Sequence, residues 1–320
     1  MKMKRIGNFY EKVISLDNLQ KADELARKGK TKSYGVKVHD KNRNENILQL
    51  HKILENKTFK TSDYHIFKIY EPKEREVYRL PYFPDRIVHH AIMNVIEPIW
   101  MSVFTDDTYS CIKGKGVHAA VKKLKKDMND VKGTKYCLKL DIKKFYPNIN
   151  HDILKSIIRK KIKDKDLLLL LDGIIDSAPG VPIGNYLSQY FANLYLAYFD
   201  HYIKEELKVR YYYRYADDIV ILSNNKTHLH FLLNTIRIYF NERLKIEIKR
   251  NHQIFPVEAR GIDFLGYRFY HTHILLRKSI KKRFARAVSR KHGNIRQIHA
   301  AYWGWAKHCN SINLLKKLTA

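Results

Sequence analysis

The sequence predicts an α+β fold, and three observations support this class. Polar and apolar side chains alternate, or β-branched and aromatic side chains are enriched, as in β-strands, in residues 65–70, 135–141 and 210–222. Residues 186–206 and 228–244 instead repeat apolar side chains at helical spacing. The 320 residues are enough for several subdomains around a substantial core, without internal repeats or low-complexity segments.

The charge of the chain indicates a polyanionic partner. Its 61 Lys and Arg residues against 32 Asp and Glu residues give a formal net charge of +29. Each phosphate that such a surface neutralises adds salt-dependent affinity, which is typical of nucleic-acid binding. A membrane surface is also anionic, but the sequence has no long apolar run and no signal peptide, so we expect no membrane partner.

The cysteines indicate a reducing compartment. Cys111, Cys137 and Cys309 are odd in number and far apart, so neither a disulfide framework nor a zinc site follows from them. We therefore expect a cytoplasmic protein.

Two adjacent acids, Asp217 and Asp218, lie between an aromatic run and an aliphatic run. Both runs favour strands, so the acids are expected where the chain turns back as a β-hairpin. Adjacent carboxylates repel, and a divalent cation bound by their hard oxygen atoms would remove that repulsion. A solvated Asp-Asp turn is the alternative, and the pair alone does not decide between them.

A third acid, Asp141, favours the metal interpretation. It ends the alternating stretch 135–141, so a rigid strand would aim its carboxylate. Two metal ions about 3.5–4 Å apart, held by carboxylates from neighbouring strands, can activate a 3′-hydroxyl and stabilise a departing pyrophosphate. Asp141, Asp217 and Asp218 are the residue types that this chemistry needs.

Three motifs, in this order, resemble those of the reverse transcriptases. They are Asp141 followed by Phe145-Tyr146, the segment 180–189, and Tyr-Ala-Asp-Asp at 215–218. The resemblance implies a right-hand polymerase fold, with fingers, a palm of antiparallel sheet backed by helices, and a helical thumb. It also implies an RNA-directed DNA polymerase, a nucleotidyltransferase whose partners are template RNA, a cDNA or primer strand and deoxynucleoside triphosphates. Two Mg²⁺ ions, or Mn²⁺ in their place, would be bound by Asp141, Asp217 and Asp218, with Ile142 beside them.

The resemblance divides the chain into four parts. Residues 1–60 form a basic, helical N-terminal extension, and residues 61–134 correspond to the fingers. Residues 135–272 correspond to the palm, with a residual fingers segment at about 150–180. Residues 273–320 correspond to the helical thumb.

Basic residues of the predicted fingers resemble those that hold the incoming triphosphate. Lys73 and Arg75 follow a strand-like stretch, and Arg86 follows Asp85, a predicted helix N-cap. The spacing leaves Arg79 as an alternative to Arg75, and Arg86 has a structural ion pair as its alternative role.

Lys113 and Lys115 alternate with Gly114 and Gly116 before a predicted helix. Glycines there would let backbone amides approach a phosphate, and the family places template contacts near this segment. An ordinary turn is the alternative. We therefore count both lysines as predicted contacts to a nucleic-acid backbone.

Tyr146 stands where the family carries an aromatic ring that excludes ribonucleotides by a clash at the 2′ position of the sugar. One of Phe145 and Tyr146 is expected in the core, and the spacing favours Tyr146 as the gate. Lys249 ends a predicted strand, 245–249, where the family has a basic residue near the departing pyrophosphate. An exposed lysine on a strand is the alternative for Lys249.

The C-terminal third carries two further resemblances. The predicted primer grip has Phe264, Leu265, Gly266 and Tyr267 at its turn. A basic amphipathic helix is expected at 278–291 in the predicted thumb. Its side chains that we expect to face a nucleic-acid backbone are Lys281, Lys282 and Arg286. The two tryptophans of the later Trp-Gly-Trp, at 303 and 305, are expected in the core of the thumb.

The segment 180–189 departs from the pattern of most reverse transcriptases. It carries Ile183-Gly184 and Gln189 where most have a Gln-Gly pair and a proline. This variant resembles the reverse transcriptases of diversity-generating retroelements, a bacterial and phage group within the group II intron-like superfamily. An apolar Ile183 under the nascent base pair would supply shape but no directed hydrogen bond, and Gly184 would permit close backbone approach.

That resemblance implies error-prone cDNA synthesis from a template-repeat RNA. The errors fall opposite template adenines, and mutagenic retrohoming then diversifies a target gene. A small helical accessory variability protein is the further partner it implies. One alternative is a reverse transcriptase of another bacterial lineage, derived from a group II intron or associated with defence. The other is a non-catalytic RNA-binding protein on a polymerase scaffold, against which the three intact acids argue.

Overall fold

The computed structural model describes residues 5–70, 74–289 and 294–319. The chain divides into two compact units, each assembled from segments that are not contiguous in the sequence. The first comprises Met1–Thr105, Lys143–Phe199 and Asn241–Ile246, and the second comprises Asp106–Ile142, Asp200–Phe240 and Glu247–Ala320. The four-part division from the sequence stays a prediction.

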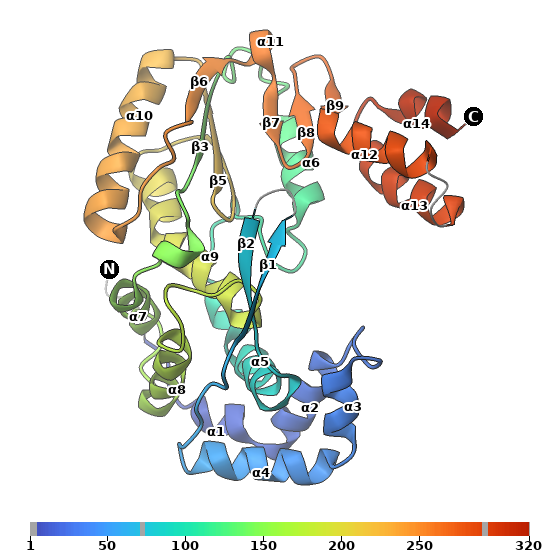
Figure 1. The fold of residues 1–320 in the computed structure, drawn as a ribbon. Helices are drawn as coiled ribbons and strands as arrows, with labels where there is room; N and C mark the ends of the chain where they lie inside the picture. The colour runs from blue at the N-terminus through green and yellow to red at the C-terminus, as the bar shows by residue number, and fades with distance from the viewer. Residues whose placement is uncertain (1–4, 71–73, 290–293, 320) are drawn as a thin grey trace. The chain divides into compact units, whose positions relative to one another are not determined.

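The first unit is mainly helical (Figure 1). Its helices are α1 (Tyr10–Ile14), α2 (Leu16–Ala26), α3 (Tyr34–Asp40), α4 (Arg43–Glu55), α5 (Ile87–Met101), α7 (His151–Arg159), α8 (Lys165–Ile175) and α9 (Tyr186–His201), whose last two residues belong to the second unit. The apolar helix α5 is largely buried because α1 and α2 pack against it. The strands β1 (His65–Tyr70) and β2 (Glu74–Arg79) pair antiparallel as an exposed hairpin.

The second unit contains two antiparallel sheets. The four-stranded sheet has the order β4-β5-β3-β6, with β4 (Tyr211–Tyr215), β5 (Asp218–Ser223), β3 (Tyr136–Asp141) and β6 (Gln253–Pro256). The three-stranded sheet contains β7 (Ile262–Phe264), β8 (Tyr267–Phe269) and β9 (Ile274–Leu276). Its helices are α6 (Val117–Asp127), α10 (Lys226–Tyr239), α11 (Val257–Arg260), α12 (Lys278–Ser289), α13 (Ile295–Ala306) and α14 (Ile312–Thr319).

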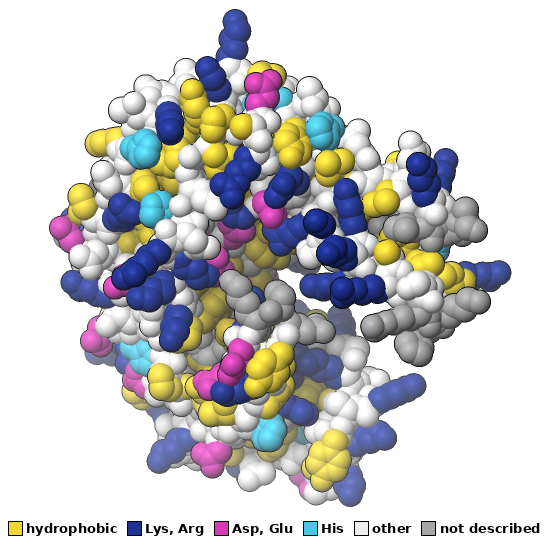
Figure 2. All heavy atoms as spheres, turned by 45° about the horizontal axis from the view of Figure 1, so that its top comes forward, with side chains coloured by type: hydrophobic (Ala, Val, Ile, Leu, Met, Phe, Trp, Pro, Cys, Tyr) yellow, Lys and Arg dark blue, Asp and Glu magenta, His cyan; other side chains and the backbone are white. Residues whose placement is uncertain are grey.

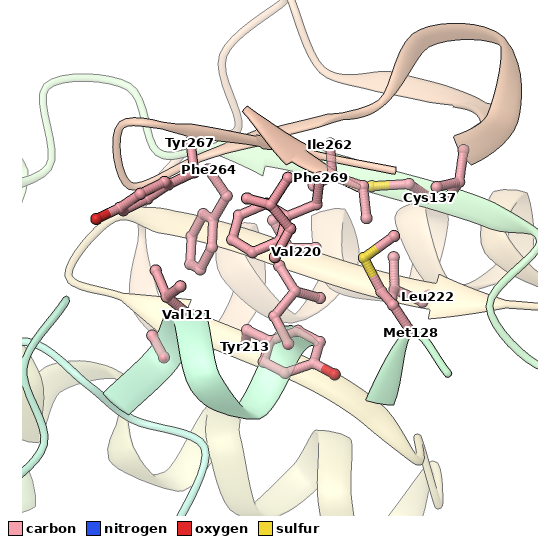
Figure 3. Close-up of a cluster of buried hydrophobic side chains, with 14 of the residues drawn as sticks. Val121, Met128, Cys137, Tyr213, Val220, Leu222, Ile262, Phe264, Tyr267 and Phe269 are labelled. Atoms are coloured by element: carbon pink, nitrogen blue, oxygen red, sulfur yellow. The ribbon is translucent and has the colours of Figure 1, made fainter. Parts of the chain in front are cut away.

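Successive side chains of β3 and β5 point to opposite faces of the four-stranded sheet, and both faces are covered. Cys137, Val220 and Leu222 point to one face, where they join a buried cluster with α6 and the three-stranded sheet (Figure 3). Buried residues of β7 and β8, such as Phe264 and Phe269, cover that side. The helix α10 packs on β3, β5 and β6 through an apolar stripe of its own. The sheet is therefore held rigidly from both sides.

Three local predictions from the sequence are wrong. The stretch 245–249 is not a strand: Ile248 forms only an isolated bridge, and β6 takes the place beside β3. Asp85 does not cap α5, because its carboxylate accepts a hydrogen bond from the Ser62 amide at 3.0 Å and the helix begins two residues later. Trp303 is not in the core but 49% exposed, whereas the ring of Trp305 packs against Tyr267.

Candidate active site

The two adjacent acids lie at the tip of the hairpin β4–β5, as the sequence predicts. Tyr215 of β4 pairs with Asp218 of β5, so Ala216 and Asp217 form the two-residue turn. Ala216 has φ +51°, a left-handed conformation that suits the turn of such a hairpin but is uncommon for a residue with a Cβ.

The strand register brings the third acid to the same place. Asp141, the last residue of β3, is the direct cross-strand partner of Asp218. The next residue, Ile142, donates its backbone N–H to the Asp217 carbonyl at 3.3 Å. Lys139, Asp141 and Asp218 follow the same alternation as Cys137 and Val220, so they emerge on the side of the three-stranded sheet.

Two lysines neutralise part of this negative charge. Lys249 Nζ lies 2.5 Å from Asp141 Oδ1, and the backbone N–H of Lys249 donates to the Asp141 carbonyl at 2.8 Å. Lys139 Nζ lies 3.7 Å from Asp218 Oδ2 and also donates to the backbone carbonyl of Asp263. Lys139 therefore connects the acids to the β7–β8 hairpin.

Burial and mutual repulsion disfavour the ionised forms of the hairpin acids. Burial, and then the charge of Asp141, raise the pKa of Asp217 from its ordinary 3.8 to about 6. Burial is also the main reason that the pKa of Asp218 rises to about 6, with Lys139 opposing the shift. Such shifts in a cluster of carboxylates are typical of functional sites.

The donor chemistry of the cluster fits a hard divalent cation. Asp218 Oδ1 is buried and accepts no hydrogen bond from any residue that the structure describes. Three carboxylates that repel one another supply the oxygen ligands that Mg²⁺ prefers. As the side chains stand, no group of three or more His, Cys, Asp or Glu residues in the described part of the chain forms a ready metal cluster. Lys249 Nζ occupies Asp141 Oδ1 in this arrangement, so a cation bound by Asp141 would compete with that lysine for the carboxylate.

The predicted sugar gate lies in the first unit. Phe145 is buried, and the ring of Tyr146 meets it edge-on at 5.6 Å between centroids and remains partly exposed. This arrangement agrees with the expectation that one ring is core and the other accessible. The Tyr146 carbonyl accepts the backbone N–H of Val181 at 2.9 Å, which joins this turn to the start of the segment 180–189.

The segment 180–189 is fixed by backbone contacts within the first unit. The carbonyl of Ile183 accepts the N–H of Tyr78, in β2, at 2.8 Å. Gly184 has φ +122°, and a Cβ there would lie 2.6 Å from the Tyr78 carbonyl. The structure thus explains Gly184 by close packing against β2. The side chain of Gln189 is exposed on α9.

The basic residues of the predicted fingers have different surroundings. Arg75 is exposed on β2, whereas Arg86 is half-buried and its Nε donates to the Ala26 carbonyl at 3.3 Å. Burial lowers the pKa of the Arg86 guanidinium. Lys73 lies outside the described residues.

The predicted nucleic-acid contacts of the second unit are mostly exposed. Lys113, Lys282 and Arg286 are exposed, Lys281 is partly buried, and Lys115 Nζ pairs with Asp106 at 2.8 Å. Figure 2 shows Lys and Arg side chains spread over the face that it draws. None of the described helices is both long and apolar enough to span a bilayer.

The predicted primer grip forms a tight turn between β7 and β8. Its two turn residues, Leu265 and Gly266, have φ +49° and +88°. The flanking Phe264 and Tyr267 are fully buried in the cluster of Figure 3. If this turn contacts a primer, Leu265 and the backbone of the turn would therefore make the contact.

Three residues near the acids were not predicted from the sequence, namely Lys139, Arg214 and Asp200. Arg214 pairs with Asp200 next to the acidic turn, and both are fully buried. A charged residue inside an aromatic strand is a signal for such a pair, but its partner is visible only in the fold.

Comparison with known proteins agrees with this geometry. Residues 71–269 match the family described as "Reverse transcriptase (RNA-dependent DNA polymerase)". Protein YkfC of Escherichia coli is 26% identical over an alignment of 270 residues, and the match covers 69% of this chain and 69% of YkfC. The Retron Ec73 reverse transcriptase of Escherichia coli is 30% identical over an alignment of 165 residues, and the match covers 46% of this chain and 52% of that one. The Group II intron-encoded protein LtrA of Lactococcus lactis is 22% identical, and the match covers 59% of this chain and 43% of LtrA.

Solved structures support the fold. Telomerase from Candida tropicalis, in complex with a fragment of telomeric RNA, has a TM-score of 0.51 at 12% identity, covering 81% of this chain and 53% of that chain. Telomerase from Candida albicans has a TM-score of 0.50 at 10% identity, covering 73% and 50%. The likeness confirms the predicted α+β fold of the right-hand polymerase class.

Proposed function

Because the chain belongs to the reverse transcriptase (RNA-dependent DNA polymerase) family, we propose that it copies an RNA template into DNA from deoxynucleoside triphosphates. Membership confirms the predicted enzyme class, an RNA-directed DNA polymerase. The observation that carries the proposal is the meeting of Asp141, Asp217 and Asp218 at one end of a rigid sheet. The +29 charge supports binding of the template and of the primer or cDNA strand.

In the proposed reaction, the 3′-hydroxyl of the primer attacks the α-phosphate of the nucleotide and pyrophosphate leaves. Two Mg²⁺ ions bound by Asp141, Asp217 and Asp218 would activate the hydroxyl and stabilise the leaving group. The strands β3 and β5 aim the carboxylates, which need little reorganisation for the reaction. We assign Lys249, already in contact with Asp141, to the departing pyrophosphate.

We assign nucleotide selection to residues of the first unit. Tyr146 would exclude ribonucleotides, since its partly exposed ring rests on the buried Phe145. Arg75, with Lys73, would bind the triphosphate because it is exposed, whereas the hydrogen bond of Arg86 to Ala26 supports a structural role for that side chain.

Primer extension tests the proposed activity. The wild-type protein should extend a DNA primer on an RNA template with Mg²⁺ and deoxynucleotides, and Asp217→Asn should lose at least about 10²-fold in rate, as when other transition-state stabilising groups are removed. Equal extension by both proteins would exclude the site. RNA binding without extension by the wild type would favour the non-catalytic alternative.

We further propose that the chain is the error-prone polymerase of a diversity-generating retroelement. Ile183 and Gln189 support this assignment, since they replace the usual Gln and Pro of the segment 180–189. Mutagenic retrohoming from a template-repeat RNA, an accessory variability protein and a bacterial or phage cytoplasm belong to the same proposal.

Sequencing of the cDNA tests this finer proposal. With an adenine-containing template we expect errors concentrated opposite adenine, and fewer of them in Ile183→Gln, because the amide supplies a directed hydrogen bond. Gln189→Pro is the companion variant at the other unusual position. Accurate copying of adenine by the wild type, with and without an accessory protein, would favour a reverse transcriptase of another lineage.

A further inference from the structure

Arg214 and Asp200 form a fully buried ion pair beside the acidic turn. Both side chains are 0% exposed. Arg214 Nε donates to Asp200 Oδ1 at 2.8 Å, and Nη2 donates to Oδ2 at 2.6 Å. The guanidinium and the carboxylate therefore form a bidentate ion pair. Stability alone is a weak reason for such a pair, because well-packed apolar residues are often as stable.

The surroundings of the pair fix the guanidinium in place. Tyr212 donates its hydroxyl to Asp200 Oδ1 at 2.5 Å, and Thr108 donates to Oδ2 at 2.9 Å. The backbone N–H of Arg214 donates to the Asp107 carbonyl, and its carbonyl accepts the N–H of Tyr109, both at 3.0 Å. Asp200 and residues 107–109 of the second unit therefore hold both the side chain and the backbone of Arg214.

The guanidinium reaches the catalytic turn through its third nitrogen. Arg214 Nη1 donates to the Ala216 carbonyl at 3.2 Å. Ala216 is the left-handed residue of the turn, a conformation that is unfavourable for an alanine by roughly 1–2 kcal/mol. The accepting carbonyl belongs to the peptide bond between Ala216 and Asp217, so this hydrogen bond restrains the backbone that carries the Asp217 carboxylate.

We propose that Arg214, held by Asp200, is a positioning residue for the polymerase reaction. It stabilises the left-handed Ala216 and thereby aims Asp217 at the metal and the reacting groups, without touching substrate itself. The inference deepens the proposed polymerase function and rests on it.

Arg214→Lys is the first test, because a lysine keeps the charge beside Asp200 but has no planar fork to reach Ala216 as well. We expect a folded protein whose kcat falls about 10–100-fold, as for a small misplacement of a catalytic group, with the KM for dTTP changed less than about 2-fold. Mn²⁺ binding to the protein without nucleic acid, measured by electron paramagnetic resonance, should weaken in parallel.

The double variant Arg214→Met with Asp200→Asn separates positioning from stability. It removes both charges and so leaves no unpaired charge in the interior, while the amide oxygen still accepts a hydrogen bond. We expect it to regain most of the melting temperature that a single variant loses and to keep the low kcat. The matched control is Arg27→Lys, which alters the pair of Arg27 with the buried Asp23 in the first unit. It should lower stability without changing kcat per folded molecule.

Two results would overturn the inference. One is recovery of kcat together with melting temperature in the double variant, and the other is wild-type Mn²⁺ affinity in Arg214→Lys or, where that variant does not fold, in the double variant. A wild-type protein without polymerase activity would instead refute the proposed function. The Mn²⁺ affinities of the variants would still show whether Arg214 orients the Asp217 carboxylate.

Discussion

Asp141 and Asp218 face each other as direct partners across the antiparallel pair β3–β5. Carboxylates opposite each other in a sheet destabilise it unless something neutralises them. Here Lys249 and Lys139 do so in part, and among the described residues Asp218 Oδ1 finds no hydrogen-bond donor. The site therefore holds carboxylates at some cost to the folded state, which suits a function in binding cations.

Replacing Asp218 by Asn should separate stability from activity. Since burial raises the pKa of Asp218 from 3.8 to about 6, its ionisation at neutral pH costs the folded state free energy relative to the unfolded chain, and the neutral amide should stabilise the metal-free protein. We expect the melting temperature to rise by about 2–4 °C while primer extension is lost. Asp172→Asn is the control: it removes an acid that pairs with Arg159, and should not raise the melting temperature. A lower melting temperature in Asp218→Asn would contradict the argument.

The response to Mg²⁺ should depend on pH. The folded pKa values of Asp217 and Asp218 lie near 6, above the ordinary 3.8, so the folded protein binds protons more tightly than the unfolded chain. Without metal, their contribution to stability is present below about pH 4 and is lost as pH rises toward 6. Mg²⁺ competes with these protons, so the rise in melting temperature that it causes should be much smaller at pH 5 than at pH 7.5.

Calorimetry with and without MgCl₂ across that range measures the effect. The double variant Asp217→Asn with Asp218→Asn should show no response to Mg²⁺ at any pH. A response of equal size at pH 5 and 7.5 would mean that Mg²⁺ acts elsewhere on the protein.

Lys139→Met should shift the acid limb of the activity profile. Lys139 opposes the rise in the pKa of Asp218, so without it that pKa should rise further and activity should fail at a higher pH. The variant also loses the hydrogen bond to the Asp263 carbonyl, which should weaken the attachment of the β7–β8 hairpin. The pH dependence of kcat/KM measures the first effect, with the exposed Lys132→Met as control. Superimposable profiles would show that Lys139 does not influence Asp218.

The position of the acidic hairpin β4–β5 was predictable because its signals are local. An Asp-Asp pair between two strand-forming runs and an acid at a strand end specify where the carboxylates emerge, and the register then joins Asp141 to Asp218. Lys249 lies beside Asp141, although 245–249 forms no strand, and its predicted place near the departing pyrophosphate stays a prediction. The alternating apolar and polar side chains of 245–249 suggested that strand, but the segment forms only one β-bridge, between Ile248 and Ile142.

Features that depend on contacts distant in sequence were not predictable. Trp303 and Trp305 are about 200° apart around one helix, so only one of them can face the core, and periodicity does not say which. Asp85 has a side chain suited to capping a helix, but its carboxylate instead accepts a hydrogen bond from the backbone N–H of Ser62, which is remote in sequence. The partner of Arg214 is 14 residues away on a different element, where only the fold brings it close.

Gly266→Ala should destabilise the second unit more than its backbone angle alone explains. Gly266 has φ +88°, and a Cβ there would lie 2.7 Å from the Trp305 ring and 2.8 Å from Ile280. Gly114 has a similar φ of +80° but no atom within 4 Å of the same position, so Gly114→Ala measures the backbone cost by itself. We expect roughly 1–2 kcal/mol for Gly114→Ala and about 1–3 kcal/mol more for Gly266→Ala, because α12 and α13 must move to admit the methyl group. Chemical denaturation of both variants measures the loss in the free energy of unfolding. Equal losses in the two variants would mean that Trp305 and Ile280 do not pack tightly on the turn, and that other contacts attach the β7–β8 hairpin to the C-terminal helices.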